Sequence, residues 1–104
     1  MKKLSFVFIL LCSIACNQVS EIEECGKHFQ AHQDLKSLKC VVELLPSTAD
    51  TSLVKKLLGT PIDMGFDYRY LIDSTSVNGC AVGAVFHIND AGKIDQKWID
   101  EICE

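Results

Sequence analysis

Six cysteines are the residues of this 104-residue chain whose type and spacing point most directly to chemistry. That number is unusual for a cytosolic protein and typical of an exported one, because thiols oxidise to disulfides outside the cytoplasm. Two of them, Cys12 and Cys16, lie within the first sixteen residues. The other four form an even set that can make two disulfides, and they are Cys25, Cys40, Cys80 and Cys103.

The start of the chain has the pattern of a signal peptide. Two lysines are followed by an apolar run that is too short to span a membrane. The segment Ser13-Ile14-Ala15-Cys16 resembles the lipobox of bacterial lipoproteins, in which the cysteine receives a lipid and the chain is cut before it. We therefore predict a signal peptide over residues 1–15, lipidation at Cys16 and a tether over residues 16–21. The alternative is cleavage by ordinary signal peptidase, which would release a soluble protein.

The side chains with metal-ligand spacing are Cys25, His28 and His32, which share one face of a predicted helix. No fourth ligand lies nearby in the sequence, and a disulfide explains Cys25 better, so we predict no metal site and no cofactor. The sequence also has no Cys-x-x-Cys, no Gly-x-Ser-x-Gly and no phosphate-binding loop. We therefore predict no catalytic residues and no enzyme activity, and we interpret His87 as a packing residue.

Arg69, the only arginine of the chain, lies between Tyr68 and Tyr70 on a predicted strand. Arginine and tyrosine are common at the centres of protein interfaces, so these three residues are our candidates for binding a partner. In the alternative interpretation Arg69 is a solvated strand position. The pattern favours this second interpretation for the aromatic residues, in which Tyr68, Tyr70, Phe86 and Trp98 form the core of the sheet face.

The elements that must position these residues begin with two helical stretches. Apolar residues at helical spacing form one stripe over residues 22–32 and another over residues 35–45. The two stripes are too far apart in angle for one straight amphipathic helix. We therefore predict a break at Gln33-Asp34, with Asp34 as the N-cap of the second helix.

A third helix is predicted over residues 51–58. Asp50 or Ser47 can cap its start, Gly59 suits the position after its end, and Pro61 prevents continuation. Beyond the proline three strands are predicted, over residues 66–73, 79–88 and 93–99. The first alternates between apolar and polar residues, and the second is apolar on both faces, which suits a central strand. The prediction is one α+β domain over residues 22–104, with N-terminal helices packed on a three-stranded antiparallel sheet.

The last two strands should form a hairpin, because the turn residues 89–92 end in glycine. In its last strand we expect Ile94, Gln96 and Trp98 to lie on one side. This hairpin also restricts the disulfides. If Ile88 lies near Lys93 across the turn, the register of the two strands follows, and with it the residues that lie opposite each other.

That register places Cys80 opposite Glu101 and close to Cys103, so a Cys80–Cys103 disulfide is geometrically reasonable. Cys25–Cys40 follows by elimination and requires the helix break. An unbroken helix would separate these two cysteines by about 22 Å, beyond the reach of a disulfide. The crossed pairing, which would tie both helices to the strands, stays open.

Charge and length restrict the function further. Without the signal peptide and its two lysines, 89 residues remain, with fourteen acidic and eight basic side chains and a net charge of −6. This balance argues against binding nucleic acid and against a basic patch for anionic lipid. The length suits one small domain, in which each disulfide would contribute about 2–4 kcal/mol of stability.

Three segments resemble the SmpA/OmlA family, the small lipoproteins of the outer-membrane β-barrel assembly machinery. They are Val54–Pro61 with its Leu-Leu-Gly-Thr-Pro helix end, the aromatic Phe66–Tyr70, and Phe86–Ile94 with its glycine turn. The resemblance covers about residues 35–99. It implies two helices against a three-stranded antiparallel sheet, as in the β-lactamase inhibitor proteins, with structural roles for Gly59, Pro61 and Gly92.

The expected location is the outer membrane, facing the periplasm. Asn17 follows the lipobox cysteine where inner-membrane lipoproteins of enteric bacteria carry aspartate. We therefore expect a lipid-anchored protein-binding or scaffolding lipoprotein, in outer-membrane assembly or envelope maintenance. The alternative is a periplasmic inhibitor or immunity protein that binds a toxin or enzyme. Both functions imply a membrane contact through the lipid, a protein partner, and no nucleic acid.

Overall fold

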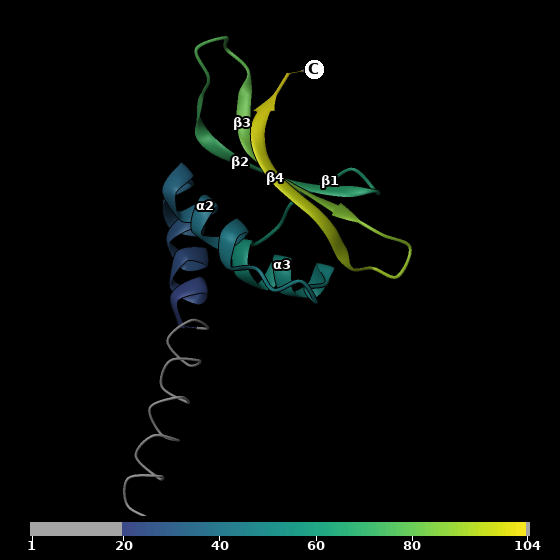
Figure 1. Ribbon diagram of the computed structural model, residues 1–104. Coiled ribbons are helices and arrows are strands. Elements are labelled where there is room, and N and C mark those ends of the chain that lie inside the picture. The colour runs from purple at the N-terminus through teal and green to yellow at the C-terminus, as the bar shows by residue number, and fades with distance from the viewer. Residues whose placement is uncertain (1–19, 104) are drawn as a thin grey trace, which may run out of the picture.

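A computed structural model describes residues 20–103 of the chain (Figure 1). Within this range three helices are followed by a four-stranded antiparallel sheet, which confirms the predicted α+β class with N-terminal helices. The helices are the stretch over residues 20–32, α2 (Leu35–Leu44) and α3 (Thr51–Leu58). The strands are β1 (Ile62–Asp63), β2 (Asp67–Thr75), β3 (Ala81–Ile88) and β4 (Ile94–Ile102).

The predicted signal peptide, Cys16 and most of the predicted tether lie outside the described residues. The last two residues assigned to the tether, 20 and 21, are already helical. Across residues 20–103, no helix has both the length and the apolar character needed to cross a membrane.

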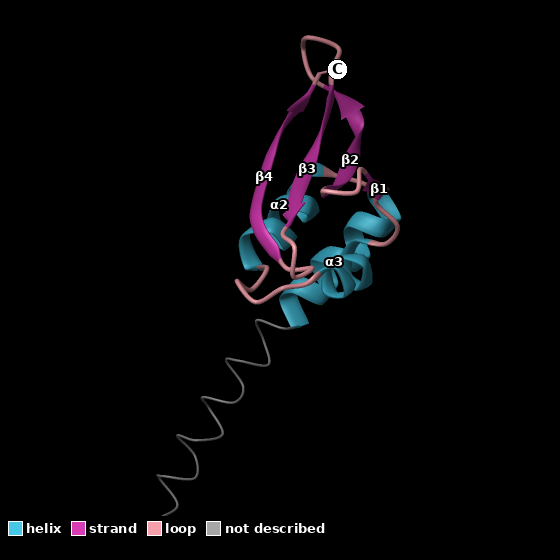
Figure 2. Cartoon of the chain, turned by 90° about the vertical axis from the view of Figure 1, so that its right-hand side faces the viewer, coloured by secondary structure: helices cyan, strands magenta, loops and turns pink. Residues whose placement is uncertain are grey.

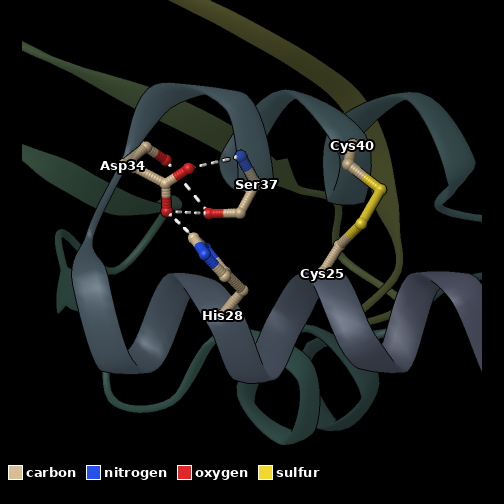
Figure 3. A network of polar contacts seen from close by, with 5 residues as sticks. All are labelled: Cys25, His28, Asp34, Ser37 and Cys40. Carbon is tan, nitrogen blue, oxygen red and sulfur yellow. Dashed lines mark hydrogen bonds and ion pairs between the residues drawn. A yellow bond between two sulfur atoms is a disulfide. The ribbon is translucent and has the colours of Figure 1, made fainter.

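The first two helices lie side by side because the chain reverses at Gln33 (Figure 3). Gln33 has a φ of 51°, and Asp34 begins α2 as its N-cap. The Asp34 side chain accepts a hydrogen bond from the Ser37 N–H at 3.0 Å, which satisfies one of the unpaired amides of the first helical turn. The break and the cap therefore lie where the apolar spacing predicts them.

The helix α3 also begins and ends where its sequence predicts. Asp50 accepts a hydrogen bond from the Leu53 N–H at 2.9 Å, so the alternative cap, Ser47, is not used. Gly59 follows the helix with a φ of 88°, in the region that favours glycine.

Gly26 allows the helix over residues 20–32 to approach α3 closely. A Cβ atom at this position would overlap the backbone carbonyl group of Leu57. The Gln30 side chain donates a hydrogen bond to the same carbonyl oxygen at 2.8 Å. This bond satisfies one of the unpaired carbonyls at the end of α3, so the two helices are fixed together by a backbone contact and a side-chain cap.

The sheet has four strands in the order β1-β2-β3-β4, not the predicted three. The additional strand, β1, pairs Ile62 with Arg69 and Asp63 with Tyr68. It escapes prediction because two residues are too few to show an alternation. A turn at Gly65, whose φ is 88°, folds it back onto β2. The central position predicted for residues 79–88 is confirmed, since β3 pairs with β2 and β4.

The register of the β3–β4 hairpin differs from the expected one by two residues. Ala81 pairs with Ile102, so Cys80 faces Cys103 rather than Glu101. Near the turn the register shifts, because Asp95 is an extra residue in β4 that forms a bulge.

The bulge changes which side chains of β4 face the helices. Ile94 is 7% exposed and packs in the core, whereas Gln96 is exposed and Trp98 is 42% exposed. The prediction that these three residues share one side of the strand is therefore wrong. An extra residue reverses the alternation of a strand beyond it.

The hydrophobic core lies between the helices and one face of the sheet, and the views in Figure 1 and Figure 2 agree in placing the helices on that side. Its largest fully buried side chains are Phe86, Leu38, Val41 and Val54. The Tyr70 ring contacts Phe86 edge-on, and its hydroxyl donates a hydrogen bond to the Gly59 carbonyl at 2.8 Å. Burial raises the pKa of Tyr70 above its usual range, so this donor stays protonated.

Candidate functional site

The three residues predicted to bind a partner lie on two different faces of the sheet. Tyr68 and Tyr70 are 6% and 4% exposed and belong to the core. Arg69 lies between them on β2 and therefore projects from the opposite face. The structure thus leaves only Arg69 in a position to contact a partner, and the tyrosines act as core residues, as in the alternative interpretation.

The outer face of the sheet carries a row of side chains around Arg69. Its cross-strand partners are Ile62 on β1 and Val85 on β3, and Val85 in turn pairs with Trp98 on β4. Val85 is only 6% exposed although it lies outside the core, because long side chains flank it on both sides. Trp98 was predicted to be core, and its exposure on this face is a second consequence of the bulge at Asp95.

Two ionic contacts border this row. Asp67 is 5% exposed, and its carboxylate lies 3.3 Å from Nε of Arg69. His87 Nδ1 lies 2.6 Å from Oδ1 of Asp95, so His87, which we interpreted as a packing residue, is paired with an acid on the outer face. The signal was present in the sequence, because these two residues flank the predicted hairpin turn at similar distances.

A second polar site joins the first helix to α2 (Figure 3). Three groups converge on the carboxylate of Asp34: the Ser37 N–H at 3.0 Å, the Ser37 hydroxyl at 2.5 Å and His28 Nδ1 at 2.8 Å. These hydrogen bonds hold the pKa of Asp34 well below its usual range, and the bond from the Ser37 hydroxyl contributes most to the shift. The carboxylate is therefore ionised at neutral pH.

The arrangement around Asp34 does not activate a nucleophile. A serine is activated by a base that accepts its proton, usually a histidine. Here Ser37 donates to the carboxylate, and His28 contacts that carboxylate rather than the serine. The geometry supports a capping and bridging role, in which Asp34 connects the start of α2 to the preceding helix.

The four cysteines form the two disulfides that the sequence favoured. Cys25 is bonded to Cys40 with a Cα–Cα distance of 6.1 Å, and Cys80 to Cys103 with 5.1 Å. The first joins the two antiparallel helices beside the Asp34 site (Figure 3), and the second closes the hairpin at its open end. The crossed pairing is thereby ruled out. Glu101 lies beside Cys80 and Cys103, but both sulfurs are used in the disulfide and cannot ligate a metal.

Comparisons with protein-family models, with curated proteins and with solved structures each found no match to this chain. The resemblance to the SmpA/OmlA family therefore rests on the three sequence segments that carry it. It stays a prediction about function.

Proposed function

We propose that this protein is a lipid-anchored component of the bacterial cell envelope that binds a protein partner through the outer face of its sheet. The observation that carries the proposal is the row formed by Ile62, Arg69, Val85 and Trp98. Within residues 20–103, no helix packs on this face, and Ile62 and Trp98 are 48% and 42% exposed.

The composition of the row supports a protein partner. Tryptophan and arginine are the residues most enriched among those that dominate binding energy at interfaces. Trp98 offers a large apolar surface with few rotamers to immobilise, and Arg69 is already oriented by Asp67. Val85 supplies an apolar centre between them. An apolar centre bordered by charged groups is the usual composition of an interface.

Charge favours a basic partner. The chain without its signal peptide carries a net charge of −6, and Asp67 and Asp95 border the row. A complementary positive surface would speed association and orient the partner. The signal peptide, the lipobox and the Leu-Leu-Gly-Thr-Pro segment support a place at the outer membrane, facing the periplasm, in the assembly or maintenance of the envelope.

The test is affinity capture of barrel-assembly components with the full chain as bait, compared with an unrelated lipoprotein. We expect enrichment for the wild type and its loss for Trp98→Ala. Truncation of a tryptophan that anchors an interface costs about 2 kcal/mol or more, which weakens binding about 30-fold. Val77→Ala is the matched control, because Val77 is fully exposed at the β2–β3 turn, away from the row. Capture no better than with the unrelated lipoprotein would refute the assembly role, and equal capture by Trp98→Ala would refute the binding face.

The second candidate is a periplasmic inhibitor or immunity protein. It is favoured by the two disulfides, which fasten the helices together at one site and the hairpin at another. A cross-linked acidic domain loses little conformational entropy on binding a basic toxin or enzyme. A neighbouring gene for such a protein, and tight binding of its product to this chain, would decide for this function.

A further inference from the structure

Two histidines lie one turn apart on the first helix, next to the Asp34 site. The ring centroids of His28 and His32 are 4.4 Å apart, and the rings are tilted by 40°. Both side chains are exposed. Residues at i and i+4 share one helix face, so a single ion can contact both rings.

The contact with Asp34 fixes the orientation of His28. A carboxylate can only accept, so the Nδ1 of His28 must carry the proton in the 2.8 Å hydrogen bond. In the neutral ring the lone pair is then on Nε2, which is the form that ligates metals. A histidine oriented by a carboxylate through its other nitrogen is the usual arrangement in metal sites. Ser37 donates two hydrogen bonds to Asp34, so the carboxylate that orients His28 is itself held in place.

We propose that His28 and His32 bind a divalent transition-metal ion, one ring nitrogen each, with water completing the coordination. Imidazole ligands suit copper, zinc and nickel, and for a given site Cu²⁺ binds more tightly than the other two. Glu21, Glu24 and Lys36 line the open pocket beside His28 together with Asp34, so three carboxylates stand against one ammonium group and the excess negative charge favours a cation. With only two protein ligands, the ion would exchange readily with solution.

A metal ion bound by His28 and His32 departs from the predicted absence of a metal site. The sequence offered Cys25 as the third ligand, and the disulfide with Cys40 removes it. The fold supplies Asp34 instead, as a residue that orients a ligand rather than as a ligand. The site lies on the helices and is independent of the proposed binding face on the sheet.

The test is equilibrium dialysis of the untagged full chain in detergent against CuCl₂ and, separately, ZnCl₂. We expect one ion per chain, with Cu²⁺ bound more tightly than Zn²⁺. Either His28→Ala or His32→Ala should abolish this stoichiometric binding. His87→Ala is the matched control, because His87 is also paired with an aspartate but has no second histidine beside it, and it should bind like the wild type.

Asp34→Asn tests the positioning role, since asparagine also caps helices well. Affinity should fall about 10- to 100-fold while the circular dichroism spectrum is unchanged. The electron paramagnetic resonance spectrum of the Cu²⁺ complex should show nitrogen ligands, and His28→Ala should remove this signature. Wild-type binding by both His28→Ala and His32→Ala would overturn the site. Wild-type affinity of Asp34→Asn would overturn the role of Asp34.

Discussion

At the scale of single residues, Asp34 forms hydrogen bonds both within its own helix and to the preceding helix. It caps α2 through the Ser37 N–H, accepts from the Ser37 hydroxyl and holds His28 of the preceding helix. The capping role could be predicted, because it depends on residues within four positions along the chain. The contact with His28 could not, because it exists only when the two helices fold back on each other.

The lowered pKa of Asp34 makes stability depend on pH. Its folded-state pKa lies below the ordinary value of 3.8, so the ionised carboxylate stabilises the folded state above that pH, and the stabilisation is lost as the pH falls below it. The neutral variant Asp34→Asn lacks this dependence. In urea unfolding with the disulfides intact, we expect the wild type to be more stable at pH 6 and the difference to shrink toward pH 2. A difference that does not vary with pH would contradict this assignment.

At the scale of elements, the helices are more predictable than the strands. Caps at Asp34 and Asp50 specify where α2 and α3 begin, and the glycine at position 59 specifies where α3 ends, all from nearby residues. The sheet depends on pairing between distant residues. One extra residue, Asp95, therefore reverses the facing of Trp98 and converts a predicted core residue into a surface one.

Gly26 lies where the first helix contacts α3, and substitution of this glycine tests the contact. Alanine normally favours a helix over glycine by about 1 kcal/mol. At this position its Cβ would overlap the Leu57 carbonyl, and backbone cannot swing aside as a side chain can. We expect Gly26→Ala to lower the free energy of unfolding by about 1–3 kcal/mol, measured by urea denaturation. Lys27→Ala, at the next and exposed position, should change it by less than about 0.5 kcal/mol. A Gly26→Ala variant at least as stable as the wild type would show that the helices do not touch here.

At the scale of the whole molecule, the order of helices and sheet along the chain decides which end of the domain lies near the proposed lipid anchor. The described chain begins at the helical end of the domain, and its C-terminus lies at the far end of the sheet (Figure 1). The lipid predicted at Cys16 precedes the first described residue by four positions. The proposed lipid attachment would therefore hold the helical end near the membrane and let the sheet extend away from it.

The anchor itself is tested by Cys16→Ala. An acyl chain contributes about 0.8 kcal/mol of membrane affinity for each buried methylene group, so its loss should move the protein from the detergent phase to the aqueous phase. Cys12→Ala is the control, because Cys12 belongs to the predicted signal peptide and should be removed with it. Intact-mass measurement should show a lipid on the wild type and on the control only. Unchanged partitioning of Cys16→Ala would refute lipidation at this position.

Local patterns in the sequence predict the helices, the break and cap at Asp34, the hairpin and the even set of four cysteines, because each depends on neighbouring residues or on simple counting. Three features require the folded chain: the choice between the two cysteine pairings, the burial of Tyr68 and Tyr70 with exposure of Trp98, and the contact of His28 with Asp34. These outcomes depend on register and on the packing of helices. A shift of one or two residues changes which side chains meet, and no local pattern in the sequence measures that shift.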